Sequence, residues 1–246
     1  MQPREFFGDI DAQAEQGGFL RQAFAQFGAA DVLEALGAMI DIPPQKSLDV
    51  LNQIGLCFLY AQNYHLAMKY VAPVRRELGF RTIFNILGPL VNPAGASMEL
   101  LGVYDADLVE PLAKVLFNLG VEKAMVVHGI DGLDEISMSS PTSVCEFRES
   151  EFRLYTLDPA KYGFNLCRKE DLVGGTPAEN AAITRSILNG EPGPKADAVL
   201  LNCAAGIYLA REDFTIQDGL DLARDTIDSG KALAQLDQFI ALTNQP

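Results

Sequence analysis

The sequence lacks the features that would place the protein in a membrane or send it through one. No stretch approaches 18 consecutive apolar residues, the length that a membrane-spanning helix needs. Residues 1–20 contain no basic segment followed by an apolar segment, so they do not resemble a secretory leader. We therefore expect a cytoplasmic protein that makes no membrane contact.

Paired cysteine motifs are also missing. Cys57, Cys145, Cys167 and Cys203 are scattered, without CxxC or Cys/His spacing, and most have apolar neighbours. This pattern favours buried free thiols in a reducing compartment over a disulfide or a zinc site.

Positive charge is scarce. The chain has 19 Lys and Arg against 33 Asp and Glu, a formal net charge of −14, which argues against a surface for nucleic acid or anionic membrane. A local cationic pocket remains possible. With 246 residues, 48% of them hydrophobic, the chain can bury one large core or two small ones.

The first third of the chain reads as helical. Residues 30–36 predict a short helix that ends at a glycine, and a second helix is expected from an N-cap at Ser47 to Ile54. Residues 64–78 also have helical character but are interrupted at Pro73.

A strand–helix–strand pattern follows. Residues 98–104 and 123–129 resemble strands, and 105–120 form the expected helix between them, which implies a parallel pair. A hairpin and further helices are expected after it, namely strands in 145–149 and 152–158 and helices in 176–190, 197–210 and 218–242. We predict an α/β fold: a central, mainly parallel sheet with flanking helices and a helical layer over about 30–80.

Three segments carry residues that could bind a ligand or take part in a reaction. In "VVHGIDGLDEIS" (126–137), Asp131, Asp134 and Glu135 crowd a glycine-broken loop at the carboxyl end of a strand, where ligands bind in parallel sheets. Hard oxygen ligands suit Mg²⁺, but the spacing alone favours a solvated acidic turn over a metal site. In "FNILGPLVNPAGASMELLG" (84–102), Gly88-Pro89 and Asn92-Pro93 predict a rigid loop between two buried segments.

The third segment, "HLAMKYVAPVRRELGFR" (65–81), concentrates basic residues just before that loop: His65, Lys69, Arg75, Arg76 and Arg81. A guanidinium there suits a bidentate carboxylate contact, and a solvated basic helix face explains the pattern as well. His65 and His128 are ambiguous by themselves. Gly174-Gly175 before a helix start could bind an anion or simply form a turn. No Ser/His/Asp order, P-loop or dinucleotide fingerprint is present.

Several of these motifs together resemble the anthranilate phosphoribosyltransferase family. They are "ADVLEALG", "HLAMKYVAPVRRELGFRTIFNILGPLVNPA", "LLGVYD", "VVHGIDGLDEIS", "GGTPAENAAI" and "IDSGKALAQL", in that order over about residues 28–242. The resemblance implies transfer of phosphoribosyl from phosphoribosyl pyrophosphate to anthranilate, with release of pyrophosphate, in a homodimer of the type-III phosphoribosyltransferase fold.

The resemblance also implies roles for individual residues. Arg75 would hold the anthranilate carboxylate, His65 would line the route to it, and Gly88 and Pro89 would form part of the pocket wall. Asp134 and Glu135 would hold Mg²⁺ against the pyrophosphate. The proline-locked loop would then give a flat aromatic acid a preformed pocket.

The chain departs from the family at its N-terminus. It has no GTGGD phosphate loop, no Asn-x-Ser-Thr motif and no Lys-His-Gly-Asn motif, and residues 1–27 match nothing in the family. Ala29 stands for a serine, Leu66 for a proline and Val91 for a threonine. We therefore expect an unmatched segment over 1–27 and a phosphoribosyltransferase-like α/β domain over 28–246. A catalytically inactive homologue that only binds a small molecule or a partner is the alternative, and a nucleoside phosphorylase of the same fold is a weaker one.

Overall fold

The structure is a computed structural model, and it describes residues 29–64 and 84–245. The N-terminal helices are α3 (Ala29–Leu36), α4 (Pro44–Ile54), α5 (Ala61–Tyr64) and α7 (Phe84–Leu90). The sheet region contains β1 (Met98–Gly102), η1 (Ala106–Leu108), α8 (Val109–Asn118), β2 (Lys123–Gly129), β3 (Thr142–Arg148) and β4 (Glu151–Leu157). The C-terminal part contains η2 (Pro159–Tyr162), η3 (Lys169–Leu172), α9 (Pro177–Leu188), α10 (Pro194–Ala210), α11 (Ile216–Asp228) and α12 (Lys231–Thr243).

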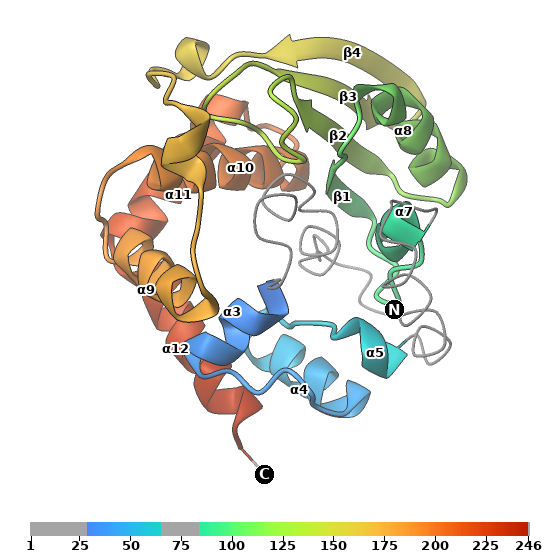
Figure 1. The fold of residues 1–246 in the computed structure, drawn as a ribbon. Coiled ribbons are helices and arrows are strands. Elements are labelled where there is room, and N and C mark those ends of the chain that lie inside the picture. The colour runs from blue at the N-terminus through green and yellow to red at the C-terminus, as the bar shows by residue number, and fades with distance from the viewer. Residues whose placement is uncertain (1–28, 65–83, 246) are drawn as a thin grey trace, which may run out of the picture.

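The described strands form one sheet in the order β1-β2-β3-β4, seen at the top of Figure 1. β1 and β2 are parallel, as expected for strands joined through α8, whereas β2–β3 and β3–β4 are antiparallel. The α/β class is confirmed, but the expectation of a mainly parallel sheet is wrong for these strands, because the sheet is mixed. A two-residue turn at Glu149-Ser150, with Glu149 at φ 55°, makes β4 run back along β3.

Successive side chains of β2 point to opposite sides of the sheet, and each side packs into a different core. Met125 and Val127 belong to a core shared with α10 and α11, which includes Leu201, Leu209 and Leu220. Ala124 and Val126 belong to a second core shared with α8, which includes Leu112, Leu116 and Phe147. The sheet is therefore a central layer, and its strand ends are the edges left for a site.

A buried carboxylate in the middle of β3 ties the sheet to α10. Glu146 of β3 is only 5% exposed, and it accepts hydrogen bonds from the hydroxyls of Tyr155 (2.9 Å) and Tyr208 (2.7 Å). The Nε of Arg148 donates to the same carboxylate at 3.1 Å, and its guanidinium lies 4.2 Å from the centre of the Tyr208 ring. Burial, followed by the negative charge of Glu146, raises the pKa of Tyr155, so its hydroxyl remains a donor.

Helices α3 and α4 lie at the opposite end of Figure 1, where α4 packs against α12 and α3 packs against α9. Their core includes Ile40, Val50 and Phe58 together with Phe239 of α12. The predicted helix over 30–36 is confirmed by α3. The predicted N-cap at Ser47 is wrong, because α4 begins at Pro44, where a proline's missing N–H costs nothing, and Ser47 is buried inside the helix.

The C-terminal helices follow their local signals closely. Thr176 caps α9 and forms a reciprocal capping box with Glu179, and Thr215 does the same for α11 with Asp218. Gly230, at φ 73°, separates α11 from α12. All four cysteines are free; Cys57 and Cys145 are buried as expected, but Cys203 is exposed. None of the described helices is both long and apolar enough to cross a membrane.

Candidate functional site

The carboxyl ends of the two parallel strands lie side by side and present one loop, residues 130–141, which we call the acidic loop. Val103, just after β1, donates its N–H to the carbonyl of Val127 at 2.9 Å. The Nδ1 of His128 lies 2.7 Å from the carbonyl oxygen of Val103. Because a carbonyl only accepts, Nδ1 must carry the proton, and the buried His128 is a structural link between the strand ends.

Asp131 holds the acidic loop together from within. Its carboxylate accepts hydrogen bonds from the hydroxyls of Ser137 (2.8 Å) and Ser139, and from the Leu133 N–H (3.4 Å). Burial acts to raise the pKa of Asp131. The hydrogen bonds from the Ser139 and Ser137 hydroxyls and the Leu133 N–H lower the pKa by more than burial raises it, so the net shift is downward. Asp131 is therefore an ionised carboxylate whose oxygens are already used by the loop.

Neighbouring elements hold the loop from outside. A Cβ on Gly102, the last residue of β1, would lie 1.6 Å from the carbonyl oxygen of Asp134, so only glycine fits there. Lys169 of η3 donates through Nζ to the carbonyl of Asp131. Asn202 of α10 accepts from the N–H of Ile136 at 3.1 Å and donates to the Ile136 carbonyl at 2.9 Å.

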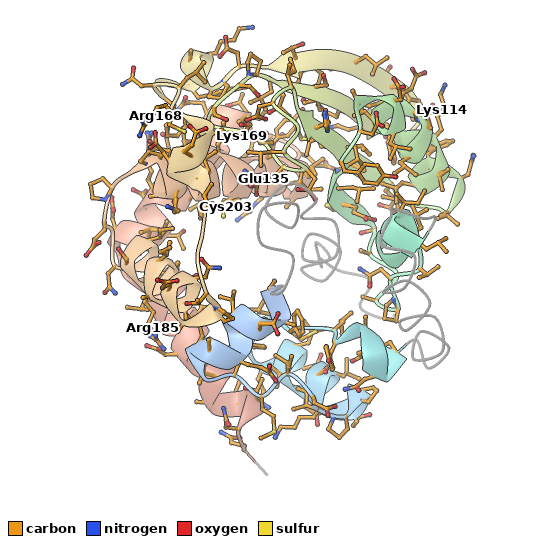
Figure 2. All side chains as sticks on the ribbon, viewed as in Figure 1. Lys114, Glu135, Arg168, Lys169, Arg185 and Cys203 are labelled. Atoms are coloured by element: carbon orange, nitrogen blue, oxygen red, sulfur yellow. The ribbon has the colours of Figure 1, made fainter. Side chains whose placement is uncertain are left out.

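The two predicted metal ligands lie in the middle of this held segment. Asp134 is 9% exposed, and Glu135 is partly exposed and lies on the inner side of the elements in Figure 2. Burial raises the pKa of Glu135 to about 7, and the negative charges of Asp134 and Asp131 act in the same direction. A carboxylate in this position is stabilised by either a proton or a cation.

The carboxylates of the acidic loop suit a Mg²⁺ ion whose remaining coordination positions are filled by water and substrate. Within residues 29–64 and 84–245, no group of three His, Cys, Asp or Glu side chains is placed to hold a metal ion. Mg²⁺ commonly uses one or two carboxylates and keeps its other positions for water and phosphate oxygens. Asp134 and Glu135 are two adjacent carboxylates of that kind, whereas the oxygens of Asp131 accept hydrogen bonds from within the loop.

The predicted anthranilate residues are placed only in part. His65 and Arg75 lie outside the described residues. Gly88 and Pro89 lie in α7, so the prediction of a rigid loop over 84–93 is wrong for its first half. Ile86 and Leu90 of this helix pack against the core shared with α8.

The turn itself comes later in this segment. Asn92 accepts the N–H of Ala94 at 2.9 Å through its side chain, and Gly95 has φ 58°. The sequence signal at Asn92-Pro93 was therefore correct, while that at Gly88-Pro89 was overridden by helix formation.

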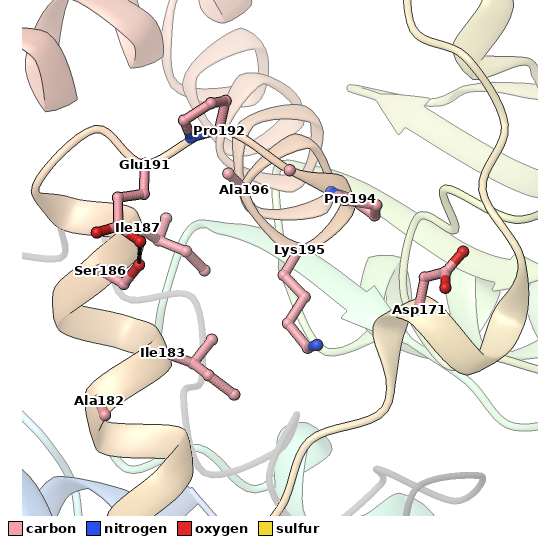
Figure 3. A pocket seen from close by; sticks show the side chains of 11 residues that line it. Asp171, Ala182, Ile183, Ser186, Ile187, Glu191, Pro192, Pro194, Lys195 and Ala196 are labelled. Carbon is pink, nitrogen blue, oxygen red and sulfur yellow. Dashed lines mark hydrogen bonds between the residues drawn. The ribbon is translucent and has the colours of Figure 1, made fainter.

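A pocket of about 430 Å³ lies between η3, α9 and the start of α10 (Figure 3). Ile183 and Ile187 of α9 form an apolar wall, and Lys195 points into the space from α10. Asp171, at the opposite rim, is paired with Arg168 at 2.8 Å. Sequence reasoning missed this pocket, because its lining comes from three elements and carries no motif.

The chain matches known proteins over most of its length. Residues 21–233 match the family model described as "Glycosyl transferase family, a/b domain". The anthranilate phosphoribosyltransferase of Lachnoclostridium phytofermentans is 62% identical over 218 residues, 89% of this chain and 65% of that protein. The enzyme of the same name from Methanobrevibacter smithii is 60% identical over 91% of this chain and 67% of that protein.

Solved structures give the same result. The anthranilate phosphoribosyltransferase of Thermus thermophilus matches with a TM-score of 0.84 and 40% identity, over 96% of this chain and 72% of that one. The Saccharomyces cerevisiae enzyme in complex with PRPP and Mg matches with a TM-score of 0.80 and 29% identity, over 87% of this chain and 62% of that one. The chain thus spans about two thirds of the length of these relatives. It belongs to the glycosyl transferase family with an a/b domain, and within that family to the anthranilate phosphoribosyltransferases.

Proposed function

We propose that the protein transfers a phosphoribosyl group from phosphoribosyl pyrophosphate to anthranilate and releases pyrophosphate. The observation that carries this proposal is the Asp134–Glu135 pair, held at the carboxyl ends of β1 and β2 with the pKa of Glu135 raised to about 7. Such a pair is suited to a cation that also contacts phosphate. The similar yeast enzyme has been solved with PRPP and Mg, and also with 4-fluoroanthranilate.

In this proposal Asp134 and Glu135 hold Mg²⁺, which when bound would neutralise negative charge on the leaving pyrophosphate. Arg75 would pair with the anthranilate carboxylate, where a guanidinium offers two parallel hydrogen bonds. His65, Gly88 and Pro89 would line the pocket for the aromatic ring. These four assignments rest on the family resemblance.

The reaction needs positioning more than base catalysis. The amine nitrogen of anthranilate forms a bond to the anomeric carbon of the ribose, the bond from that carbon to the pyrophosphate oxygen breaks, and the amine proton leaves to solvent. An aniline-type amine is neutral at pH 7 and needs little activation. Holding both substrates in line therefore accounts for most of the expected rate enhancement.

We extend the proposal to the organisation of the protein. Residues 28–246 would form the phosphoribosyltransferase-like domain, which the family match extends back to residue 21, and the residues before it would form a separate segment, in a cytoplasmic homodimer. The four free cysteines support a reducing compartment. The net charge of −14 supports small-molecule substrates over nucleic acid.

The test is the loss of anthranilate fluorescence when the purified protein meets phosphoribosyl pyrophosphate and Mg²⁺. Glu135→Gln and Arg75→Ala should each lower turnover by at least about a hundredfold, the range expected for loss of a main electrostatic or orienting group. Asp225→Asn is the matched control, because Asp225 is a residue of α11 outside the acidic loop and its replacement removes the same charge. It should leave turnover unchanged.

Two results would contradict the proposal. Unchanged turnover in Glu135→Gln would show that the Glu135 carboxylate is not needed for the reaction. A folded wild-type protein that binds anthranilate but shows no turnover would support the alternative of a protein that only binds its ligand.

A further inference from the structure

We propose that Asn202 is a positioning residue for the Asp134–Glu135 pair: its side-chain amide clips the backbone of the next residue, Ile136, and so fixes where the two carboxylates point. This inference rests on the proposed function, because it assigns Asn202 to the cation-binding loop of that same site.

The clip is a complete peptide-group contact. The Oδ1 of Asn202 accepts from the Ile136 N–H at 3.1 Å, and its Nδ2 donates to the Ile136 carbonyl oxygen at 2.9 Å. The same Nδ2 also donates to the carbonyl of Ala198, one turn earlier in α10, at 2.9 Å. The amide is thus anchored to its own helix and holds both polar groups of one loop residue.

The helix that carries the clip is firmly placed. α10 packs against β1 and β2, and Leu201, Ala204 and Ala205, which lie close to Asn202 in sequence, are fully buried. The side chain of Ile136 is itself fully buried in the same core. The position of the Glu135 backbone therefore follows the position of α10, although the loop has no helix or strand hydrogen bonds of its own.

Asparagine suits this position because of its neutral amide. Asp131, Asp134 and Glu135 place three carboxylates within five residues, so the loop needs restraint without another negative charge. A primary amide offers an acceptor oxygen and two donor hydrogens and carries no charge, so it pairs with a peptide group on both sides. A serine hydroxyl or a carboxylate would lack this combination.

The chain contains a chemically matched clip elsewhere. Asn180 of α9 accepts from the Gly175 N–H at 2.8 Å and donates to the Gly175 carbonyl at 3.1 Å. That contact is exposed and belongs to the turn before α9. It provides a control that loses the same hydrogen bonds away from the acidic loop.

The experiment measures Mn²⁺ binding to the full chain by the loss of the free-ion signal in electron paramagnetic resonance. Mn²⁺ is the probe because it accepts the same oxygen ligands as Mg²⁺. Wild type, Asn202→Ala, Asn202→Asp, Asn180→Ala and Glu135→Gln are compared, and the free energy of unfolding of each is measured in urea.

We expect Asn202→Ala to weaken Mn²⁺ binding by about 10- to 100-fold, the range for residues that orient ligands from behind, while Asn180→Ala keeps the wild-type affinity. Asn202→Asp guards against a folding failure of the alanine variant, because it keeps the shape and the acceptor but loses the donor. Its added charge alone would strengthen cation binding, so weaker binding in this variant supports the clip.

Wild-type Mn²⁺ affinity in a folded Asn202→Ala or Asn202→Asp protein would overturn the inference alone, even if stability fell, because the clip would then serve only the fold. If wild type shows no Mn²⁺ binding that depends on Glu135, the inference and the proposed metal role both fail. Turnover measured on the same preparations separates the two cases.

Discussion

Two carboxylates near β3 have opposite surroundings. Glu146, in the middle of the strand, is 5% exposed and receives hydrogen bonds from two tyrosine hydroxyls and one guanidinium. Glu135, in the acidic loop that leads into the strand, is more exposed, yet the charges that act on it are those of Asp134 and Asp131. The pKa of Glu135 is raised to about 7 by burial together with these charges.

The difference separates an acid that the fold itself satisfies from the acid that we propose binds a cation. A buried charge surrounded by donors is satisfied by the fold itself and gains nothing from a ligand. A charge held beside like charges costs stability until a proton or cation arrives, which is typical of binding and catalytic sites. The following predictions test this contrast in order of decreasing effect.

The largest effect is expected at the satisfied carboxylate. Glu146→Ala leaves Tyr155, Tyr208 and Arg148 without their shared acceptor, so the free energy of unfolding should fall by about 3–5 kcal/mol. Urea unfolding measures this loss. Glu151→Ala is the control in the same hairpin, since its pairing with Arg153 is exposed and should contribute less than about 1 kcal/mol. Equal losses of stability in the two variants would show that the buried Glu146 contributes no more than an exposed ion pair.

The next effect concerns the support under the acidic loop. A Cβ at Gly102 would lie 1.6 Å from the backbone oxygen of Asp134, so Gly102→Ala must displace either the strand or the loop. We expect a loss of about 1–3 kcal/mol, measured by urea unfolding, together with weaker Mn²⁺ binding. Gly206→Ala is the control, because a Cβ there meets nothing within 4 Å and should stabilise the helix by about 0.4–1 kcal/mol. Unchanged Mn²⁺ binding in Gly102→Ala would show that the contact does not fix the loop.

The third effect is the pH dependence that Glu135 confers. Its pKa rises from 4.5 to about 7 on folding, so within this window the native state holds a proton that the unfolded state has released. Stability therefore falls as pH rises through the window, by about 1–2 kcal/mol after allowance for solvent screening. Thermal or urea unfolding of the metal-free protein across this range measures the slope, which should flatten in Glu135→Gln and persist in Asp225→Asn. A slope that is the same in all three proteins would assign it to other groups.

The smallest effect is expected at an acid that is neither satisfied in the core nor crowded. Asp237 pairs with Arg185 at 3.1 Å, but both side chains are about half exposed, 56% and 42%. Asp237→Asn should change the free energy of unfolding by less than about 1 kcal/mol, and added salt should reduce even this difference. A larger change would mean that surface pairs between α9 and α12 contribute more than their exposure suggests.

Elements with local signals could be predicted from the sequence. Gly55, at φ 71°, ends α4 as its residue type indicates, and Thr176 with Glu179 marks the start of α9. The bounds of β2 were also accessible. Ser47 was misread because Pro43-Pro44 offers an earlier helix start. Gly88-Pro89 was misread because Ile86 and Leu90, on either side of it, lie in a helix that packs against the α8 core.

The candidate site could be predicted only as a location. The glycine-broken acidic segment at a strand end drew attention to Asp131, Asp134 and Glu135 together, and the family resemblance singled out Asp134 and Glu135. Neither indicated that Ser137 and Ser139 occupy the Asp131 carboxylate. Asn202 could not be found at all, because its partner lies 66 residues away and its neighbours resemble an ordinary apolar helix. Such roles depend on which elements pack together, and no pattern in the sequence records that.

The distance spanned by the Asn202 clip has a consequence for folding kinetics. The acidic loop can take its final form only after α10 has packed against the sheet, since contacts between residues 66 apart form after closure of a long loop. Residues that gain their contacts late contribute mainly to the barrier against unfolding. A cation bound at Asp134 and Glu135 should therefore slow unfolding while leaving the folding rate nearly unchanged, so that the ligand protects the folded protein without guiding the chain toward it.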